Sequence, residues 1–402
     1  MAEIKSNKIF YYSITNDSSS FVSVNMELDE PIEHARMACA VKEASKWFPY
    51  LQVRLKAQEE DLVLEPNDAP VELYQEDGCW PFRFSENGEH LYRFSAEGKQ
   101  FRLSFNHGLM DAAEAFRYMK AVLQLYYQKE EKIELQEEAF RAGDAEAMAD
   151  PYEQVPAGTV PQRTKEEPQL YKLPETRMEG YQTFRFAVSE EQFVQFTKKN
   201  QGSVNSMLAW LLEKAIRNVH PEALQEPLAI ATAINAKPIL GVEKAWMTCL
   251  HTAMNAFDAQ LDACDIAQAN AIIYKNIVDQ CEKQVLFSRL AGITWLDRYL
   301  EQLPDLETKK QVCQKSIGMQ RATANISYTG KFEWGAVEKH IRSCYTYADA
   351  ASMLIEVNCV NGKFCFAFTQ KFASDCYVKA FRALLEQYGI SCTELEMKKL
   401  YV

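Results

Sequence analysis

A histidine and an aspartate stand four residues apart in the stretch RLSFNHGLMDAAEAF, residues 102–116. An imidazole titrates near neutral pH, so His107 could accept a proton from a substrate hydroxyl or amine. The spacing His-x-x-x-Asp is weak by itself, because chance alone gives roughly a quarter of an occurrence in a chain of this composition. His107 is therefore either a catalytic base or an incidental residue at a turn.

The neighbouring residues predict a strand that ends just before His107 and a helix that begins just after it. Apolar and polar residues alternate from Gln100 to Asn106, as in a half-buried strand. Asp111 followed by Glu114 has the spacing of a helix capping box, with Asp111 as the N-cap. Capping explains Asp111 without any catalytic role and leaves His107 as the residue that needs a chemical explanation.

The charge of the chain argues against two classes of partner. The 402 residues carry a formal net charge of -12, and the average negative field repels nucleic acid and anionic lipid. No window of the sequence approaches the apolar length of a membrane span. We therefore expect no nucleic-acid partner and no membrane span.

Cysteine usage and the N-terminal residues indicate the compartment. The 11 cysteines are scattered and never spaced as C-x-x-C, which favours reduced, mostly buried thiols over a disulfide framework or structural zinc. The first 20 residues show neither the apolar segment nor the cleavage pattern of a signal peptide. The sequence predicts a cytoplasmic protein without a metal site.

The apolar pattern divides the chain into two α/β halves. Residues 1–135 form the first half, 136–180 an acidic and proline-rich crossover, and 181–402 the second half. The dipeptide at 361–362, Asn-Gly, predicts a two-residue hairpin turn. The expected strands cover 9–14, 51–55, 61–65, 90–96, 100–106, 181–188, 227–234, 323–329, 353–360 and 363–370, and the expected helices 31–49, 203–219, much of 263–318, and 374–389.

Residues 106–112 resemble the His-His-x-x-x-Asp-Gly motif of the chloramphenicol-acetyltransferase-like superfamily. This group includes alcohol acetyltransferases, plant BAHD acyltransferases and the condensation domains of nonribosomal peptide synthetases. GSVNSMLAWLLEKAI (202–216) is similar to a second helix of these proteins, and TGKFEWG (329–335) loosely matches the BAHD segment Asp-Phe-Gly-Trp-Gly. Asn106 stands for the first motif histidine and Ala112 for the motif glycine. The resemblance implies two chloramphenicol-acetyltransferase-like halves, each a mixed β-sheet flanked by helices.

The resemblance also implies a mechanism. In the superfamily the second motif histidine is the general base, so His107 takes that role, and the acceptor attacks a thioester directly without an acyl-enzyme. The motif aspartate is structural and pairs with an arginine of the second half. Here that position carries Lys237, so the resemblance implies an Asp111–Lys237 pair without the bidentate fork of an arginine. A solvated loop lysine is the alternative for Lys237.

A developing oxyanion needs a hydrogen-bond donor. The strand NISYT, residues 325–329, resembles the chloramphenicol acetyltransferase strand whose serine donates that bond, which assigns the role to Ser327. Tyr328, Asn325 and Asn106 are further candidates for contact with the oxyanion or substrate. Ser327 could equally be an ordinary strand serine bonded to a neighbour.

Three functions fit these features. The first is an acyltransferase that moves an acyl group from acyl-CoA to a small alcohol or amine, with no permanently bound cofactor. The second is a condensation-type enzyme that takes the acyl group from the thioester of an acyl carrier protein. The third is a catalytically silent relative that binds a ligand. We expect a monomer or a weak oligomer.

Overall fold

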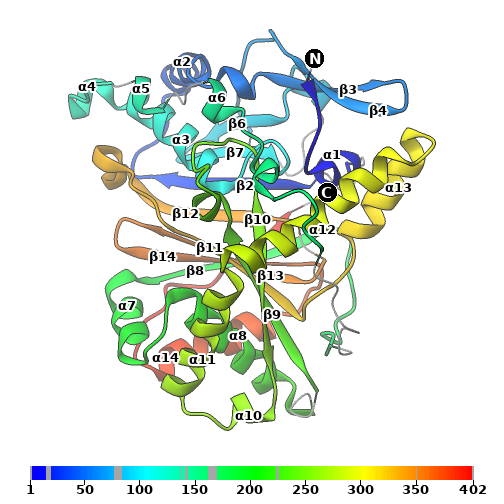
Figure 1. Cartoon of the computed structure of the whole chain (residues 1–402). Helices are drawn as coiled ribbons and strands as arrows, with labels where there is room; N and C mark the ends of the chain where they lie inside the picture. The colour runs from blue at the N-terminus through cyan, green and yellow to red at the C-terminus, as the bar shows by residue number, and fades with distance from the viewer. Residues whose placement is uncertain are drawn as a thin grey trace.

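The computed structural model describes residues 2–14, 20–76, 84–135, 137–140, 144–161, 170–222, 226–349 and 351–400. They form a mixed α/β structure with two large sheets and one small sheet (Figure 1). The α/β class implied by the resemblance is therefore confirmed.

The upper sheet in Figure 1 has five strands in the order β12-β2-β7-β6-β5. The apolar side chains on one face of this sheet pack against helices α2 and α3. The strands are β2 (Phe21–Leu28), β5 (Leu73–Tyr74), β6 (Tyr92–Glu97), β7 (Gln100–Asn106) and β12 (Ile341–Ala348), and the helices are α2 (His34–Ser45), α3 (Ala112–Tyr126), α4 (Gln128–Glu131), α5 (Glu137–Phe140) and α6 (Asp144–Ala147).

The lower sheet has seven strands in the order β10-β9-β11-β13-β14-β8-β15. Helices α7, α8, α11 and α14 cover its outer face (Figure 1). The strands are β8 (Tyr181–Ser189), β9 (Leu228–Asn235), β10 (Leu250–Phe257), β11 (Ala324–Lys331), β13 (Met353–Val360), β14 (Lys363–Gln370) and β15 (Glu396–Leu400), and the helices are α7 (Glu190–Lys199), α8 (Val204–Val219), α9 (Lys237–Leu240), α10 (Ala259–Asp262), α11 (Ile266–Gln280) and α14 (Cys376–Gln387).

The N-terminal residues lie beside two helices from late in the chain. The small sheet has the order β1-β4-β3, and α1 follows β1. Figure 1 shows α1 next to α13, which continues from α12 after a short turn. The elements are β1 (Ala2–Glu3), α1 (Lys8–Tyr12), β3 (Val53–Gln58), β4 (Asp61–Pro66), α12 (Lys283–Glu301) and α13 (Leu306–Ile317).

The strand expected at residues 9–14 is wrong. These residues belong mostly to the short helix α1, whose Tyr11 and Tyr12 rings are buried by tertiary contacts. The strand of the five-stranded sheet that follows α1 is β2, in which Val22, Val24 and Met26 alternate with polar residues. This alternation has the period of two that is typical of a strand, whereas the aromatic run at 9–14 favoured a strand in the wrong place.

Most other expected elements are confirmed within a few residues, including the hairpin at 361–362. Asn361 and Gly362 have φ angles of 47° and 72°, as the type I′ turn between β13 and β14 requires. The sequence analysis missed β12, which follows the crossover by more than 150 residues yet pairs with β2 in the first sheet. It also missed β15 at the edge of the second sheet.

The two sheets contact each other through β12. The side-chain amide of Asn358 on β13 donates to the Cys344 carbonyl at 3.1 Å and to Thr346 Oγ1 at 2.9 Å. The Arg185 guanidinium lies over the Tyr345 ring, 5.1 Å from its centroid. The layer between the sheets is therefore polar as well as apolar.

Candidate active site

His107 stands at the corner between β7 and α3. Its backbone N–H donates to the Ser20 carbonyl at 2.8 Å, which holds the end of β7 beside the start of β2. The imidazole is half-buried, and its centroid lies 5.0 Å from that of the Phe10 ring on α1. Two chain segments almost 100 residues apart therefore hold this ring.

The two ring nitrogens of His107 have different surroundings. Nδ1 lies 3.3 Å from the Met110 carbonyl oxygen, which can only accept a hydrogen bond, so the proton of the neutral ring belongs on Nδ1. Nε2 then carries the free lone pair. Burial lowers the pKa of His107 below its ordinary value, so the imidazole is neutral at pH 7. Nε2 is the basic atom of this corner.

Asn106 and Gly108 fix the backbone on either side of the histidine. Asn106 is fully buried; its amide donates to the Phe10 carbonyl at 3.1 Å, and its Oδ1 accepts from the Gly108 N–H at 2.9 Å. A Cβ at residue 108 would lie 2.7 Å from Cε2 of Tyr11. Only glycine lets α1 approach the corner this closely.

Asp111 is engaged on both carboxylate oxygens. Oδ1 accepts from the Glu114 N–H at 3.1 Å, which makes Asp111 the N-cap of α3. Oδ2 lies 2.7 Å from Nζ of Lys237, which follows β9 in the second half. Both side chains are almost fully buried, and Lys237 also donates to the Ala245 carbonyl at 2.9 Å. The structure thus brings Asp111 and Lys237 together and joins the two halves at the corner.

Glu114 does not complete the expected capping box. Its carboxylate instead lies 3.7 Å from the Lys237 ammonium and 3.6 Å from the Arg117 guanidinium. Burial raises the pKa of Glu114, and the charge of Lys237 partly offsets this effect. Lys237 therefore faces two buried acids, Asp111 and Glu114.

Thr248, just before β10, is a site residue that the sequence analysis missed. Its hydroxyl donates to the His107 carbonyl at 2.5 Å and lies 3.5 Å from His107 Nδ1. Thr248 is fully buried. No sequence signal marks a threonine 141 positions from its partner, because the contact arises only when the halves assemble.

The remaining candidates lie on β11. Ser327 is half-buried and in register with Glu356 on β13, with which it shares a hydrogen bond. Burial raises the pKa of Glu356 to about 8. The side-chain amide of Asn325 donates a hydrogen bond to the Ser352 hydroxyl at 2.7 Å. Tyr328 points to the opposite face of the strand, where its ring centroid lies 5.7 Å from that of Phe364.

Comparison with known proteins identifies the fold. No family model matches the chain, and no curated protein matches its sequence. Among solved structures, polyketide synthase associated protein 5 from Mycobacterium tuberculosis has a TM-score of 0.62 at 12% identity, over 91% of this chain and 93% of that one. TRI101 of F. sporotrichioides, in complex with coenzyme A and T-2, has a TM-score of 0.61 at 11% identity, over 96% and 98%. The chain has the chloramphenicol-acetyltransferase-like fold.

The same fold is found in the condensation domain of the monacolin K polyketide synthase MokA, with a TM-score of 0.60 at 10% identity over 96% of this chain and 95% of that one. Each of these matches covers more than nine-tenths of both chains, so the likeness in fold extends along almost the whole chain. Among the residues that the structure describes, no helix is both long and apolar enough to cross a bilayer.

Proposed function

We propose that this protein is an acyltransferase in which His107 is the general base for direct transfer from a thioester to a small alcohol or amine. The observation that carries the proposal is the arrangement of the two motif residues. His107 carries a lone pair on Nε2. Of the two carboxylate oxygens of Asp111, one accepts a hydrogen bond at the α3 N-terminus and the other is paired with the Lys237 ammonium. One residue is available for chemistry and the other holds the corner.

The chemistry needs no covalent enzyme intermediate. Nε2 of His107 accepts the proton of the acceptor hydroxyl or amine as that atom attacks the thioester carbonyl carbon. The oxyanion that forms accepts a hydrogen bond, for which the Ser327 hydroxyl is our candidate donor. The carbon–sulfur bond then breaks, and the imidazolium returns its proton to the leaving thiolate. The acyl group ends on the acceptor, and the free thiol leaves.

Acyl-CoA is the donor that we favour. TRI101, which shares the fold, was crystallised with coenzyme A. The second candidate is a condensation-type enzyme that uses a carrier-protein thioester, because the MokA condensation domain and the epimerization domain of tyrocidine synthetase B have the same fold. Domain boundaries at about residues 135 and 180 remain part of this proposal.

The first test compares His107→Ala with the wild type. With acetyl-CoA and a panel of hydroxyl and amine acceptors, the variant should lose about 100- to 10,000-fold in acceptor-dependent release of coenzyme A. His34→Ala is the control, since His34 is a half-buried histidine at the start of α2. Wild-type turnover by His107→Ala, at unchanged melting temperature, would contradict the base assignment.

Two further measurements separate the mechanisms. Intact mass after incubation with acetyl-CoA alone should show no added acetyl group, whereas a stable adduct would contradict direct transfer. Turnover with free acyl-CoA but none with an acyl carrier thioester would exclude the condensation-type reaction. Failure with every donor and acceptor, together with a thermal shift from one ligand, would favour a binding protein.

A further inference from the structure

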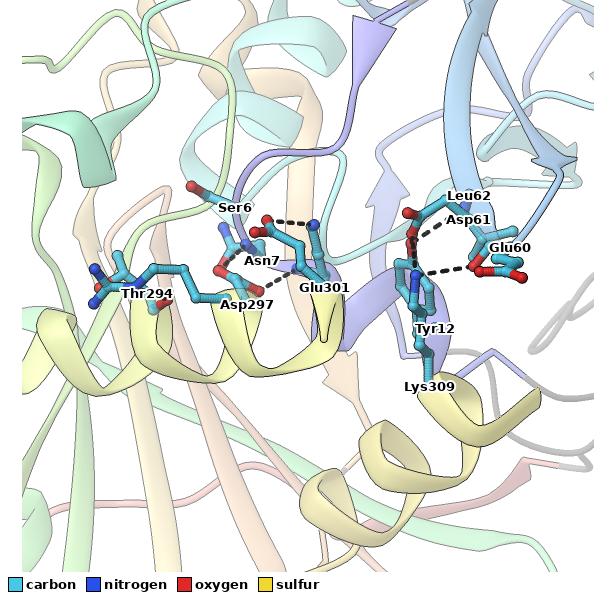
Figure 2. A network of polar contacts seen from close by, with 12 residues as sticks. Ser6, Asn7, Tyr12, Glu60, Asp61, Leu62, Thr294, Asp297, Glu301 and Lys309 are labelled. Carbon is cyan, nitrogen blue, oxygen red and sulfur yellow. Dashed lines mark hydrogen bonds and ion pairs between the residues drawn. The ribbon is translucent and has the colours of Figure 1, made fainter. Parts of the chain in front are cut away.

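The N-terminal segment connects the His107 corner to helix α12 of the second half. Asp297 on α12 accepts hydrogen bonds from the backbone N–H groups of Asn7 at 3.2 Å and Lys8 at 3.0 Å. Lys8 Nζ is paired with Glu301, one turn further along α12, at 2.9 Å. Figure 2 shows Asp297 and Glu301 facing this segment. The start of α1 is therefore fixed to α12.

A second set of contacts holds α1 farther along the chain. Tyr12 donates its hydroxyl hydrogen to Asp61 on β4, and the same carboxylate lies 3.1 Å from Lys309 of α13. Figure 2 shows this cluster beside the first one. Both ends of the five-residue helix are anchored to α12 and α13, so α1 has little freedom to move relative to them.

Asn7 is the residue from which this support reaches the corner. Its backbone is left-handed, with a φ of 58°, and it is almost fully buried. The side-chain amide donates to the Thr248 carbonyl at 2.5 Å, and Oδ1 accepts from the Tyr152 hydroxyl at 2.8 Å. Asparagine tolerates this backbone conformation better than most residues, and it persists where surrounding contacts impose it.

Thr248 completes the connection. Its carbonyl accepts from Asn7, and its hydroxyl donates to the carbonyl of His107 itself. The contacts therefore run from Asp297 through Asn7 and Thr248 to the backbone of the base. Phe10, on the same helix as Tyr11, adds its ring against the imidazole.

We propose that Thr248 and Asn7 are positioning residues for His107, held in place by Asp297 of α12. This inference rests on the proposed function. Thr248 fixes the His107 carbonyl and stands beside Nδ1, so it sets the ring rotation that directs Nε2 toward the acceptor. Among the residues that the structure describes, the Thr248 hydroxyl donates its hydrogen bond to His107 alone, at the backbone carbonyl of the base.

The decisive comparison is Thr248→Val against Thr248→Ser. Valine keeps the shape and removes the hydroxyl, while serine keeps the hydroxyl and loses a methyl group. With acetyl-CoA as donor, Thr248→Val should lose about 10- to 100-fold in kcat with KM changed less than about twofold, because a misplaced base slows the chemical step. Thr248→Ser should keep kcat within about threefold of wild type. Thr232→Val is the control, since Thr232 is equally buried on β9 and bonds Asn255 instead.

A readout that needs no substrate accompanies these rates. In protein labelled with ¹⁵N-histidine, the His107 ring resonances, identified with His107→Ala, report which nitrogen carries the proton and at which pH the ring titrates. We expect Nδ1 to be protonated in the wild type and in Thr248→Ser. In Thr248→Val we expect both tautomers and a pKa closer to 6.5, because the freed ring gains access to water. Asp111 is the charged group that acts on this ring.

A second variant tests the other link. Asn7→Gly keeps the left-handed backbone and deletes the amide that supports Thr248, so it should lower kcat in the same direction as Thr248→Val. If Thr248→Val and Asn7→Gly both keep the wild-type kcat and the wild-type His107 resonances, the positioning role is wrong. If His107→Ala is active, the proposed function fails instead, whatever the resonances show.

Discussion

The His107 corner and the β11–β13 strand pair both place ionisable groups in the interior, but they treat charge in opposite ways. At the corner the buried carboxylates Asp111 and Glu114 share the Lys237 ammonium. On β13, Glu356 is as buried, and the partner that lowers its pKa is the neutral Ser327 hydroxyl. The corner carboxylates are thus paired with a cation, while Glu356 has none beside it among the described residues and burial raises its pKa to about 8.

This difference separates a fixed region from an adaptable one. Opposite charges in a buried pair resist separation, so the corner keeps one geometry. A neutral acid and a hydroxyl can each exchange their hydrogen bond for one with a bound molecule at little electrostatic cost. We therefore expect substitutions at the corner to affect stability and base geometry, and substitutions on β11 and β13 to affect substrate handling.

The largest stability effect is expected from Lys237→Met. Removing the ammonium leaves the buried Asp111 without its cation and Glu114 with Arg117 alone, which should cost about 3–5 kcal/mol in the free energy of unfolding. Urea unfolding at neutral pH measures the change. Lys275→Met, which removes an exposed i,i+4 partner of Asp279, should cost only about 0.3–0.5 kcal/mol. Equal losses for the two variants would contradict the claim that Lys237 holds buried carboxylates at the corner.

Ser327→Ala tests the adaptable region through the rate. If Ser327 donates to the oxyanion, kcat should fall about 100- to 1,000-fold at nearly unchanged stability. Thr329→Ala is the control, because Thr329 is exposed two residues later on the same face of β11. A wild-type kcat in Ser327→Ala would leave Ser327 as an ordinary strand residue.

Gly108→Ala probes how tightly α1 packs on the corner. The added Cβ meets the Tyr11 ring, and such overpacking should destabilise the protein by about 1–3 kcal/mol. Gly292→Ala on α12 has open space around the new Cβ and lies within a helix, so it should stabilise by about 0.5–1 kcal/mol. Thermal unfolding of the two variants should therefore shift in opposite directions.

Glu356 should make the stability of the protein depend on pH. In the unfolded chain Glu356 loses its proton near about pH 4.3, whereas in the folded protein its pKa is about 8. Between these values the folded state binds more protons, so the contribution of Glu356 to stability falls as the pH rises. Glu356→Gln should remove this slope, which urea midpoints at about pH 5 and about pH 8 would show. An unchanged slope would place the Glu356 pKa near its ordinary value.

The sequence predicted the elements that position the base better than the contacts that hold them. The alternation in β7 and the capping signal at Asp111 are local, so both could be read without the structure. The sequence predicted a strand at residues 9–14, where the structure has helix α1. The burial of Tyr11 and Tyr12 in that helix depends on contacts with Gly108 and β4, far along the chain. Local propensity could not reveal that packing.

The contacts between halves were out of reach for the same reason. The partner of Asp111 came from the resemblance, and the resemblance gave no place to Asn7, Thr248 or Asp297. Strand β12 crosses into the first sheet through pairing with β2, and β9 delivers Lys237 to the corner. Such pairings depend on the order of the strands in the sheets, which cannot be predicted from the residues of any one segment.

The central claim, that neutral His107 is the catalytic base, is tested most directly by measuring one pKa in two ways. The pH dependence of kcat/KM reports the pKa of the essential base in the free enzyme, and the ¹⁵N titration of His107 reports the same group by itself. Because burial lowers the pKa of His107, activity should fall only when the pH drops below about 6.5, at the pH where the His107 resonances titrate. A rate that stays constant while His107 becomes protonated would contradict the account.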